Sequence, residues 1–508
     1  MSTPQTTDTD DGGFVPLIRT VAGTGTKGFK GDGEAAISAQ LDRGFGIVAD
    51  SGGTLYFSDH ANHRVRKITV DGKVSTVAGT GSAKFGGDNG PASSAHLNWP
   101  REVAVDGAGN LYIADADNHR VRKVTPDGTI TTVAGTGQAA FSGDGGPATA
   151  ARLNAPFGVA VDGDGILYIA DYYNHRIRKV TPDGKISTIA GSASSGPKGD
   201  NGPATSAQLN RPHSVTVDSA GNLYIADSHN HRVRRVAPDG TITTVAGTGT
   251  AGSDGDAGPA AKARLNVPTG VAVDSTGVLY IAEYGGHRVR RVAPDGTITT
   301  IAGTGTAGPG GDAGPAASAQ LSNPLGLAVD SVDTLYITEY NGHRIRKITS
   351  EKMAGLPDSG EVVSWANIRS KLRIGVHRES LKDGAPANQS LTSPRAHQKW
   401  RLIATGQADG QILYRIENTR SGKVLEVADA QETAGAPVVQ RTYAGNDAHH
   451  QQWRLVPMSS ETDASRIYEI ANHHSSLLLH IGTNAPAALT QQGEDGDHRN
   501  RQWQLLPV

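Results

Sequence analysis

The sequence contains no cysteine, few aromatic residues and no excess of charge of either sign. The absence of cysteine excludes a disulfide framework and any cysteine-ligated metal site. Lysine and arginine number 48 against 50 aspartates and glutamates, so no strong field would draw the chain to nucleic acid. Aromatic residues make up only 5% of the chain, which leaves Val, Ile, Leu and Ala to build the core.

Long hydrophobic runs are also missing. No stretch of 18 apolar residues occurs, which predicts that the chain does not insert into a membrane. Residues 1–13 are polar and acidic, and they lack the basic and apolar regions of a secretory signal. The sequence therefore predicts a soluble protein with a flexible leader at residues 1–13, either cytoplasmic or exported by a non-classical route.

A fixed spacing governs the first two thirds of the chain. The motif His-Arg-(Val/Ile)-Arg occurs six times, and each copy follows the last by 56 residues. Its histidines are His63, His119, His175, His231, His287 and His343. An Ala-Gly pair keeps the same interval without insertion or deletion. Such register indicates repeated units that stack on one another.

Each unit contains four short segments rich in Val, Ile and Tyr, separated by Gly, Asp and Pro. In the third unit these segments are residues 158–162, 167–171, 176–180 and 188–191. They are typical of strands separated by turns. In four units Pro-Asp-Gly precedes the fourth segment, and Asp-Gly supplies the positive φ angles of a tight hairpin. Each unit is therefore predicted to be a four-stranded antiparallel meander.

Six such sheets can cover one another only in a radial arrangement, which predicts an all-β chain that begins with a six-bladed β-propeller. The ends of the repeat region favour closure of this ring. The sixth unit stops after residues 344–349 and has no fourth strand, while residues 17–22 form a fourth strand without a blade. The amino-terminal strand is therefore expected to complete the last blade.

Two segments carry a family resemblance. Residues 111–115 (Leu-Tyr-Ile-Ala-Asp) followed by 118–121 (Asn-His-Arg-Val) resemble NHL repeats, and residues 143–148 are similar to the long repeats of bacterial NHL proteins and teneurins. The resemblance covers roughly residues 14–350. It implies a propeller but not one function, because NHL-type propellers include modules that bind protein, RNA or sugar, and a peptide-amidating lyase.

A second domain is predicted beyond a linker at residues 351–360, where the repeat spacing ends. Residues 361–508 contain three units of about 50 residues, which end in Trp400, Trp453 and Trp503. Each tryptophan closes a Gln-x-Trp or similar motif before an apolar segment, and this pattern is similar to the ricin-type β-trefoil. The resemblance implies a trefoil core filled by the three tryptophans.

The same resemblance implies a sugar site in the middle unit. In the family a carboxylate, an aromatic platform and polar groups near Gln-x-Trp hold one sugar ring. No unit of this sequence carries the full set, and the middle unit departs least from it. Its candidate residues for carbohydrate binding are Glu426, Tyr443, Asn446 and Gln451.

Polar residues that recur in every blade are expected to be structural, since six equivalent copies cannot build one asymmetric site. The aspartates that end the second strands, such as Asp59 and Asp115, are predicted to hold the following Asn-His-Arg turn. The paired arginines are predicted to bridge strands. The loop aspartates, such as Asp32, are expected to cap a short helix, with calcium as a weaker alternative and no other cofactor.

Function is expected where the repeat varies. The segment that enters each first strand should lie at one mouth of the central channel, and its residues differ between blades. The candidate ligand-binding residues at this channel mouth are Phe45, Trp99, Arg101, Glu102, Phe157, Arg211 and His213. Aromatic faces beside convergent polar groups are typical of ligand sites.

Two functions from different classes remain open. The favoured one is a non-enzymatic recognition protein that binds glycan or a glycoconjugate through the trefoil, with the propeller as a scaffold for a ligand or a protein partner. The alternative is a metal-dependent propeller hydrolase or lyase with its site at the central channel. For that site the sequence offers Glu102 and His213, without a nucleophile motif.

Overall fold

The computed structural model describes residues 15–351 without a gap, and shorter segments after them. These segments are 362–367, 373–376, 385–390, 399–408, 411–419, 421, 423–427, 438–442, 444, 451–457, 467–472, 478–481, 489–492 and 502–507. The chain divides into two compact units, one from Pro16 to Thr349 and one that includes Ser350–Val508. The predicted leader and all but one residue of the predicted linker lie outside the described residues, so these boundaries stay predictions.

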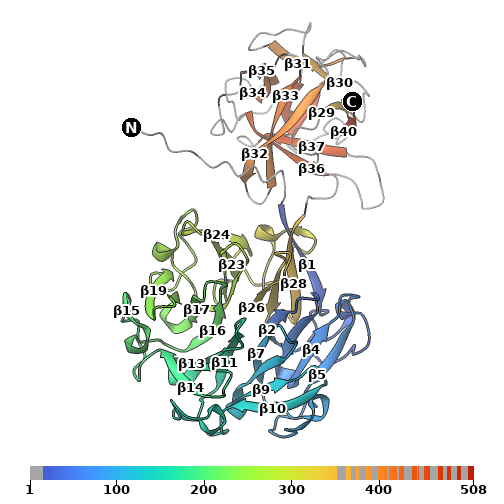
Figure 1. The fold of residues 1–508 in the computed structure, drawn as a ribbon. Helices are drawn as coiled ribbons and strands as arrows, with labels where there is room; N and C mark the ends of the chain where they lie inside the picture. Colours follow the sequence, from blue (N-terminus) through green and yellow to red (C-terminus); the bar gives the residue numbers. More distant parts are fainter. Residues whose placement is uncertain are drawn as a thin grey trace. The chain divides into compact units, whose positions relative to one another are not determined.

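The first unit consists of six antiparallel sheets, as the 56-residue spacing predicts. Each sheet has four principal strands, and Figure 1 shows the sheets following one another in chain order. The first three blades contain β2 (Gly44–Ala49), β3 (Leu55–Asp59), β4 (Arg64–Ile68) and β5 (Val74–Ala78), then β7 (Pro100–Val105), β8 (Leu111–Asp115), β9 (Arg120–Val124) and β10 (Thr129–Ala134), then β11 (Pro156–Val161), β12 (Leu167–Asp171), β13 (Arg176–Val180) and β14 (Ile186–Ala190).

The remaining blades repeat this plan. They contain β16 (Pro212–Val217), β17 (Leu223–Asp227), β18 (Arg232–Val236) and β19 (Thr241–Ala246), then β21 (Pro268–Val273), β22 (Leu279–Glu283), β23 (Arg288–Val292) and β24 (Thr297–Ala302), then β26 (Pro324–Val329), β27 (Leu335–Glu339), β28 (Arg344–Glu351) and β1 (Val15–Ala22). In four blades a two-residue Gly-Pro strand is added at the outer edge: β6 (Gly90–Pro91), β15 (Gly202–Pro203), β20 (Gly258–Pro259) and β25 (Gly314–Pro315).

The ring closes as the sequence predicts. The amino-terminal strand β1 is hydrogen-bonded between β28 and β25, so it supplies the outer strand that the sixth blade lacks. Figure 1 shows β1 beside β28, although the two strands come from opposite ends of the repeat region. The innermost strands β2, β7, β11, β16, β21 and β26 contact one another in this order, and β26 contacts β2 again. The six-bladed propeller closed by its amino-terminal strand is confirmed.

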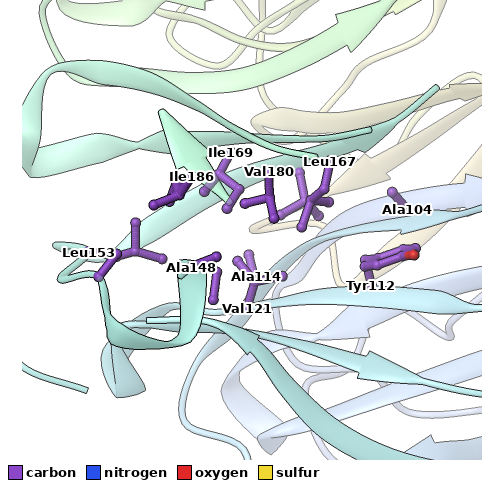
Figure 2. Packing of buried hydrophobic residues seen from close by; sticks show 13 residues of the cluster. Ala104, Tyr112, Ala114, Val121, Ala148, Leu153, Leu167, Ile169, Val180 and Ile186 are labelled. Atoms are coloured by element: carbon purple, nitrogen blue, oxygen red, sulfur yellow. The ribbon is translucent and has the colours of Figure 1, made fainter. Parts of the chain in front are cut away.

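Apolar packing between neighbouring blades forms the core. Figure 2 shows one such layer, in which side chains of blade two face side chains of blade three. The layer includes Ala104, Tyr112, Ala114, Val121, Ala148, Leu153, Leu167, Ile169, Val180 and Ile186. Most of these residues are aliphatic, as the low aromatic content predicts. Small alanines on one sheet against Ile, Leu and Val on the next allow the blades to approach closely.

The repeated arginines form a buried polar layer. The second arginine of each His-Arg-x-Arg motif has no exposed surface and pairs with two carboxylates of its own blade. In blade three, Arg178 lies 2.7 Å from Asp144 and 3.3 Å from Asp171. The side chain of Asn174 donates to Asp171 at 2.8 Å. The predicted structural roles of the strand-end carboxylates and of the arginines are confirmed.

The predicted role of the loop aspartates as helix caps is wrong. The segment after each loop is a three-residue 3-10 turn, such as Ala36–Ser38, and no side-chain hydrogen bond caps it. Instead, Asp32 Oδ1 accepts from Arg66 at 2.7 Å, and Asp32 Oδ2 accepts from the Thr76 hydroxyl at 2.6 Å. The expectation failed because the partner arginine lies 34 residues further along the chain, beyond the reach of a local pattern.

The second unit is a β-trefoil built from twelve strands. They are β29 (Val362–Asn367), β30 (Arg373–Val376), β31 (Ala385–Ser390), β32 (Trp400–Ala408), β33 (Gln411–Asn418), β34 (Val424–Val427), β35 (Val438–Arg441), β36 (Trp453–Pro457), β37 (Ile467–Asn472), β38 (Leu478–Ile481), β39 (Leu489–Gln492) and β40 (Gln502–Pro507). Six of them pair in a closed barrel in the order β29, β32, β33, β36, β37, β40 and back to β29. The hairpins β30–β31, β34–β35 and β38–β39 complete the threefold plan.

The tryptophans of the trefoil act as core residues where they are described. Trp400 and Trp453 have no exposed surface. The indole nitrogen of Trp453 donates to the backbone carbonyl of Leu425 at 3.0 Å, which connects the first residue of β36 to β34. The side chain of Trp503 lies outside the described residues.

Candidate functional site

The residue immediately before each innermost strand stands in a left-handed backbone conformation. These six residues are Arg43, Trp99, Ala155, Arg211, Val267 and Asn323, with φ between 49° and 58°. Left-handed backbone is disfavoured for residues with a side chain, and most of all for a β-branched one such as Val267. A strong local constraint must therefore hold the chain at this point.

The repeated histidine supplies that constraint. The backbone N–H of Trp99 donates to Nδ1 of His63 in the preceding blade at 3.2 Å, and the same bond recurs around the ring at 3.0–3.2 Å. Burial lowers the pKa of His63, which favours the neutral ring that can accept at Nδ1. The six histidines thus join each blade to the next. We call these bonds the histidine latches.

The second position of each innermost strand holds Phe45, Arg101, Phe157, His213, Thr269 and Leu325, which we call the plug. The side chains of Phe45, Arg101, Phe157 and His213 contact one another across the ring. Phe45 and His213 come from opposite blades and stack with centroids 5.1 Å apart and planes 8° apart. Phe157 meets Phe45 edge-on at 6.0 Å and His213 at 5.3 Å. The predicted channel mouth is therefore filled by its own side chains at this level.

A second set of rings covers the plug, and the sequence analysis missed it. Tyr172 stacks on Phe157 at 3.7 Å with 11° between the planes, and the ring of His60 lies 5.1 Å from that of Phe45. Tyr340 lies 6.4 Å from Phe45. These residues directly follow the carboxylate that ends each second strand. That position varies between blades, reading His60, Ala116, Tyr172, Ser228, Tyr284 and Tyr340, and this variation was a usable signal.

Arg101 is the only charged member of the plug. Its guanidinium carbon lies 3.6 Å from the centroid of Phe157 and 4.8 Å from that of Phe45. Its Nε is buried without a hydrogen-bond partner, although the residue as a whole is partly exposed. Burial lowers the pKa of Arg101 to about 10, well above neutral pH, so the side chain stays cationic. The cation is held by aromatic faces rather than by a carboxylate.

Two further arginines lie at the rim of the plug. Arg43 is exposed, and its guanidinium lies 5.4 Å from the ring of Tyr340. Arg211 is placed similarly over Tyr173, at 5.5 Å. The structure thus brings six of the seven predicted mouth residues into one cluster: Phe45, Trp99, Arg101, Phe157, Arg211 and His213.

Glu102, the seventh predicted residue, has different surroundings. It is buried, and burial raises the pKa of its carboxyl to about 8, while the nearby Ser214 hydroxyl opposes this shift. The innermost strands touch backbone to backbone here, since a Cβ on Gly46 would lie 2.5 Å from Cα of Glu102. Glu102 lies beside Ser214, whereas the ring of His213 contacts Phe45 and Phe157. The described residues also contain no group of three histidines or carboxylates suited to a metal ion.

The ring of His213 is expected to stay neutral throughout about pH 5–8. Burial and the neighbouring Arg101 lower the pKa of His213 to about 3, so its contribution to stability is lost as the pH falls from the unfolded value near 6.5. Nitrogen chemical shifts of labelled histidine, recorded across this range, measure the charge directly. A transition of His213 near pH 6 would show that the stack on Phe45 is open to water.

In the trefoil, Glu426 and Gln451 lie together as predicted. Gln451 Nε2 donates to Glu426 Oε2 at 2.6 Å and to the carbonyl of Thr442 at 3.2 Å. Gln451 Oε1 accepts from the backbone N–H of Ala444 at 2.9 Å. The glutamine therefore clamps the chain on both sides of position 443. Tyr443 and Asn446 themselves lie outside the described residues.

Family models match both units. The NHL repeat model matches residues 97–124, 209–236 and 265–292, and the model of the teneurin NHL domain matches 136–198. The model of the ricin-type β-trefoil lectin domain matches 355–441 and 396–481. The propeller is built from NHL repeats, and the second unit is a ricin-type β-trefoil domain.

Curated relatives of the NHL propeller include teneurins. Human teneurin-4 is 33% identical over 253 residues, which are 44% of this chain and 9% of teneurin-4. Mouse teneurin-4 is 30% identical over 496 residues, or 89% of this chain and 16% of the relative. The chain therefore spans a small part of these proteins.

Among solved structures, a protein of unknown function from Bacteroides thetaiotaomicron is 22% identical, with a TM-score of 0.51. The match covers 66% of this chain and 76% of that protein, and it bears on the fold alone. NHL repeats and a lectin-like domain together fit a binding scaffold. Within the described residues, no helix is long and apolar enough to cross a membrane.

Proposed function

We propose that the chain is a non-enzymatic recognition protein that binds a glycan through the middle unit of its trefoil. The observation that carries this proposal is the clamp made by Gln451 on Glu426 and on the backbone at Thr442 and Ala444. A carboxylate fixed by an amide is suited to accept hydrogen bonds from sugar hydroxyls. The clamped segment also brackets Tyr443 in the sequence, which would offer the ring on which a sugar stacks.

The family match supports the same unit. Residues 396–481, which match the ricin-type lectin model, include Glu426 and Gln451. The NHL propeller would then serve as the scaffold that presents a second ligand or a protein partner. Its loops and rim residues vary between blades on a constant framework, which is the usual arrangement of a binding surface.

A glycan array probed with the whole chain tests the proposal. We expect binding to at least one glycan, and we expect Glu426→Gln to weaken it about tenfold or more, because hydrogen bonds to a charged acceptor contribute about 1.5–3 kcal/mol. The glutamine keeps an acceptor for Gln451, so the fold should survive. Glu417→Gln, on the neighbouring strand β33, is the matched control. Absence of binding to every glycan, or equal binding by Glu426→Gln, would refute the proposal.

A further inference from the structure

Arg101, which is partly exposed, differs from the buried arginines of the propeller. Arg178 and its five equivalents each pair with carboxylates within 4.0 Å. Among residues 15–351, in contrast, no carboxylate forms an ion pair with Arg101. The buried Nε of Arg101 has no acceptor, as is also true of Arg178, so the missing ion pair is the difference between them. Arg101 is only partly exposed, and its charge is offset by aromatic contacts and by the longer-range attraction of Asp117 rather than by a direct ion pair. Such a group is typical of a site that receives its counter-charge from a ligand.

The surroundings of Arg101 add to its positive charge. Arg43 and Arg211 stand on the latched left-handed positions at either side of it, and neither forms an ion pair with a carboxylate of the described propeller. His229, which is exposed, lies 6.4 Å from the ring of Tyr172 beside Arg211. Arg43, Arg101 and Arg211 thus place three cations at one end of the ring, with Asp117 as a nearby carboxylate that makes no ion pair with Arg101. Unpaired cations of this kind attract an anionic ligand.

Accessible rings lie beside these cations. Trp99 and Tyr340 are partly exposed, and Tyr173 is 48% exposed. Such faces can stack on a planar ring or on the apolar face of a sugar. The left-handed backbone at Trp99 is held by the latch to His63, so the indole is presented from a fixed position. The channel mouth therefore combines the guanidinium of Arg101, which lies against aromatic rings, with other aromatic rings that are accessible to a ligand.

We propose that this end of the propeller binds a small organic acid, whose carboxylate pairs with Arg101 and whose ring stacks on the rim aromatics. The guanidinium fork matches a carboxylate in two parallel hydrogen bonds, which adds geometric selectivity to the charge. Arg43 and Arg211 steer and flank the acid. This site lies in the propeller and does not rest on the glycan site proposed for the trefoil.

Two acids and their neutral counterparts test the site with the full chain. The probes are D-glucuronate with D-glucose, and benzoate with benzyl alcohol, titrated by calorimetry at low salt. We expect at least one acid to bind, its neutral counterpart to bind at least tenfold more weakly, and Arg101→Gln to weaken the acid at least tenfold. Arg152→Gln, an exposed arginine of the same propeller, is the matched control and should leave the affinity unchanged.

A stability measurement separates a ligand-binding role from a structural one. Arg101→Met removes the unpaired charge and keeps most of the apolar volume, so we expect a Tm equal to or above that of the unaltered chain, together with loss of acid binding. A Tm lowered as much as by Arg178→Met would make Arg101 a structural residue and would overturn the proposal. Failure of both acids to bind would also overturn it, as would binding that Glu426→Gln abolishes and Arg101→Gln leaves intact.

Discussion

Deleting residues 1–22 is expected to open the ring and to unfold the sixth blade. The deletion removes β1, whose Leu17 and Ile18 are buried, and it exposes the edge of β28. Ile18 packs in the same cluster as Ile337 and Ile348. Loss of two such aliphatic side chains costs on the order of 5 kcal/mol, which is a large share of the roughly 5–15 kcal/mol that stabilises a domain.

Hydrogen exchange with mass spectrometry measures this effect blade by blade. Peptides from residues 335–348 should lose protection first, and the neighbouring blades one and five should follow. Blades three and four, across the ring, should retain protection longest. A chain that begins at residue 14 keeps the whole of β1 and is the control. Unchanged protection of residues 335–348 in the longer deletion would show that β1 does not close the ring.

Replacing Arg178 with methionine is expected to destabilise the propeller by about 3–5 kcal/mol. The substitution keeps much of the side-chain volume, but it leaves Asp171 as a buried carboxylate without its cation and releases Asp144 from its loop position. Most of the cost comes from the uncompensated charge rather than from lost packing. Urea unfolding followed by far-ultraviolet circular dichroism measures the change in free energy.

Two further variants test this explanation. Adding Asp171→Asn to Arg178→Met should recover part of the lost stability, because the stranded charge is then removed. Arg176→Met is the matched control, since Arg176 is only half-buried and lies over the exposed ring of Phe141 at 3.8 Å. It should cost about 1 kcal/mol. Equal destabilisation by the two arginine substitutions would show that the buried ion pairs do not account for the loss of stability.

The repeat spacing predicts the propeller because each unit follows the same local rules. Strand segments, Asp-Gly turns and the missing strand of the sixth unit are all visible along the chain. Gly128 illustrates this, since its φ of 85° is the conformation that the Pro-Asp-Gly turn requires. Ion pairs between residues far apart in the sequence are harder to predict. The partner of Asp32 is Arg66, and no local pattern distinguishes that ion pair from a helix cap.

The candidate sites could likewise be predicted only where local sequence patterns reveal them. Variation between blades identified Phe45, Arg101 and His213, because an asymmetric function must break the repeat. It did not reveal that Phe45 stacks on His213, since these residues are 168 positions apart and meet only when the ring closes. Tyr172 was not predicted, because it stands between a strand-end carboxylate and a turn that recur in the blades, and its contact with Phe157 arises only from the neighbouring strand.

The histidine latches hold six backbone positions in one conformation, whichever residue stands there. Arginine, tryptophan, alanine, valine and asparagine all occupy the same left-handed geometry, because the bond to the preceding blade involves only the backbone N–H. These side chains can therefore be exchanged without removing the hydrogen bond that joins the two blades. The same property makes the six positions a natural choice for a randomised library, in which new binding specificities are evolved on an unchanged frame.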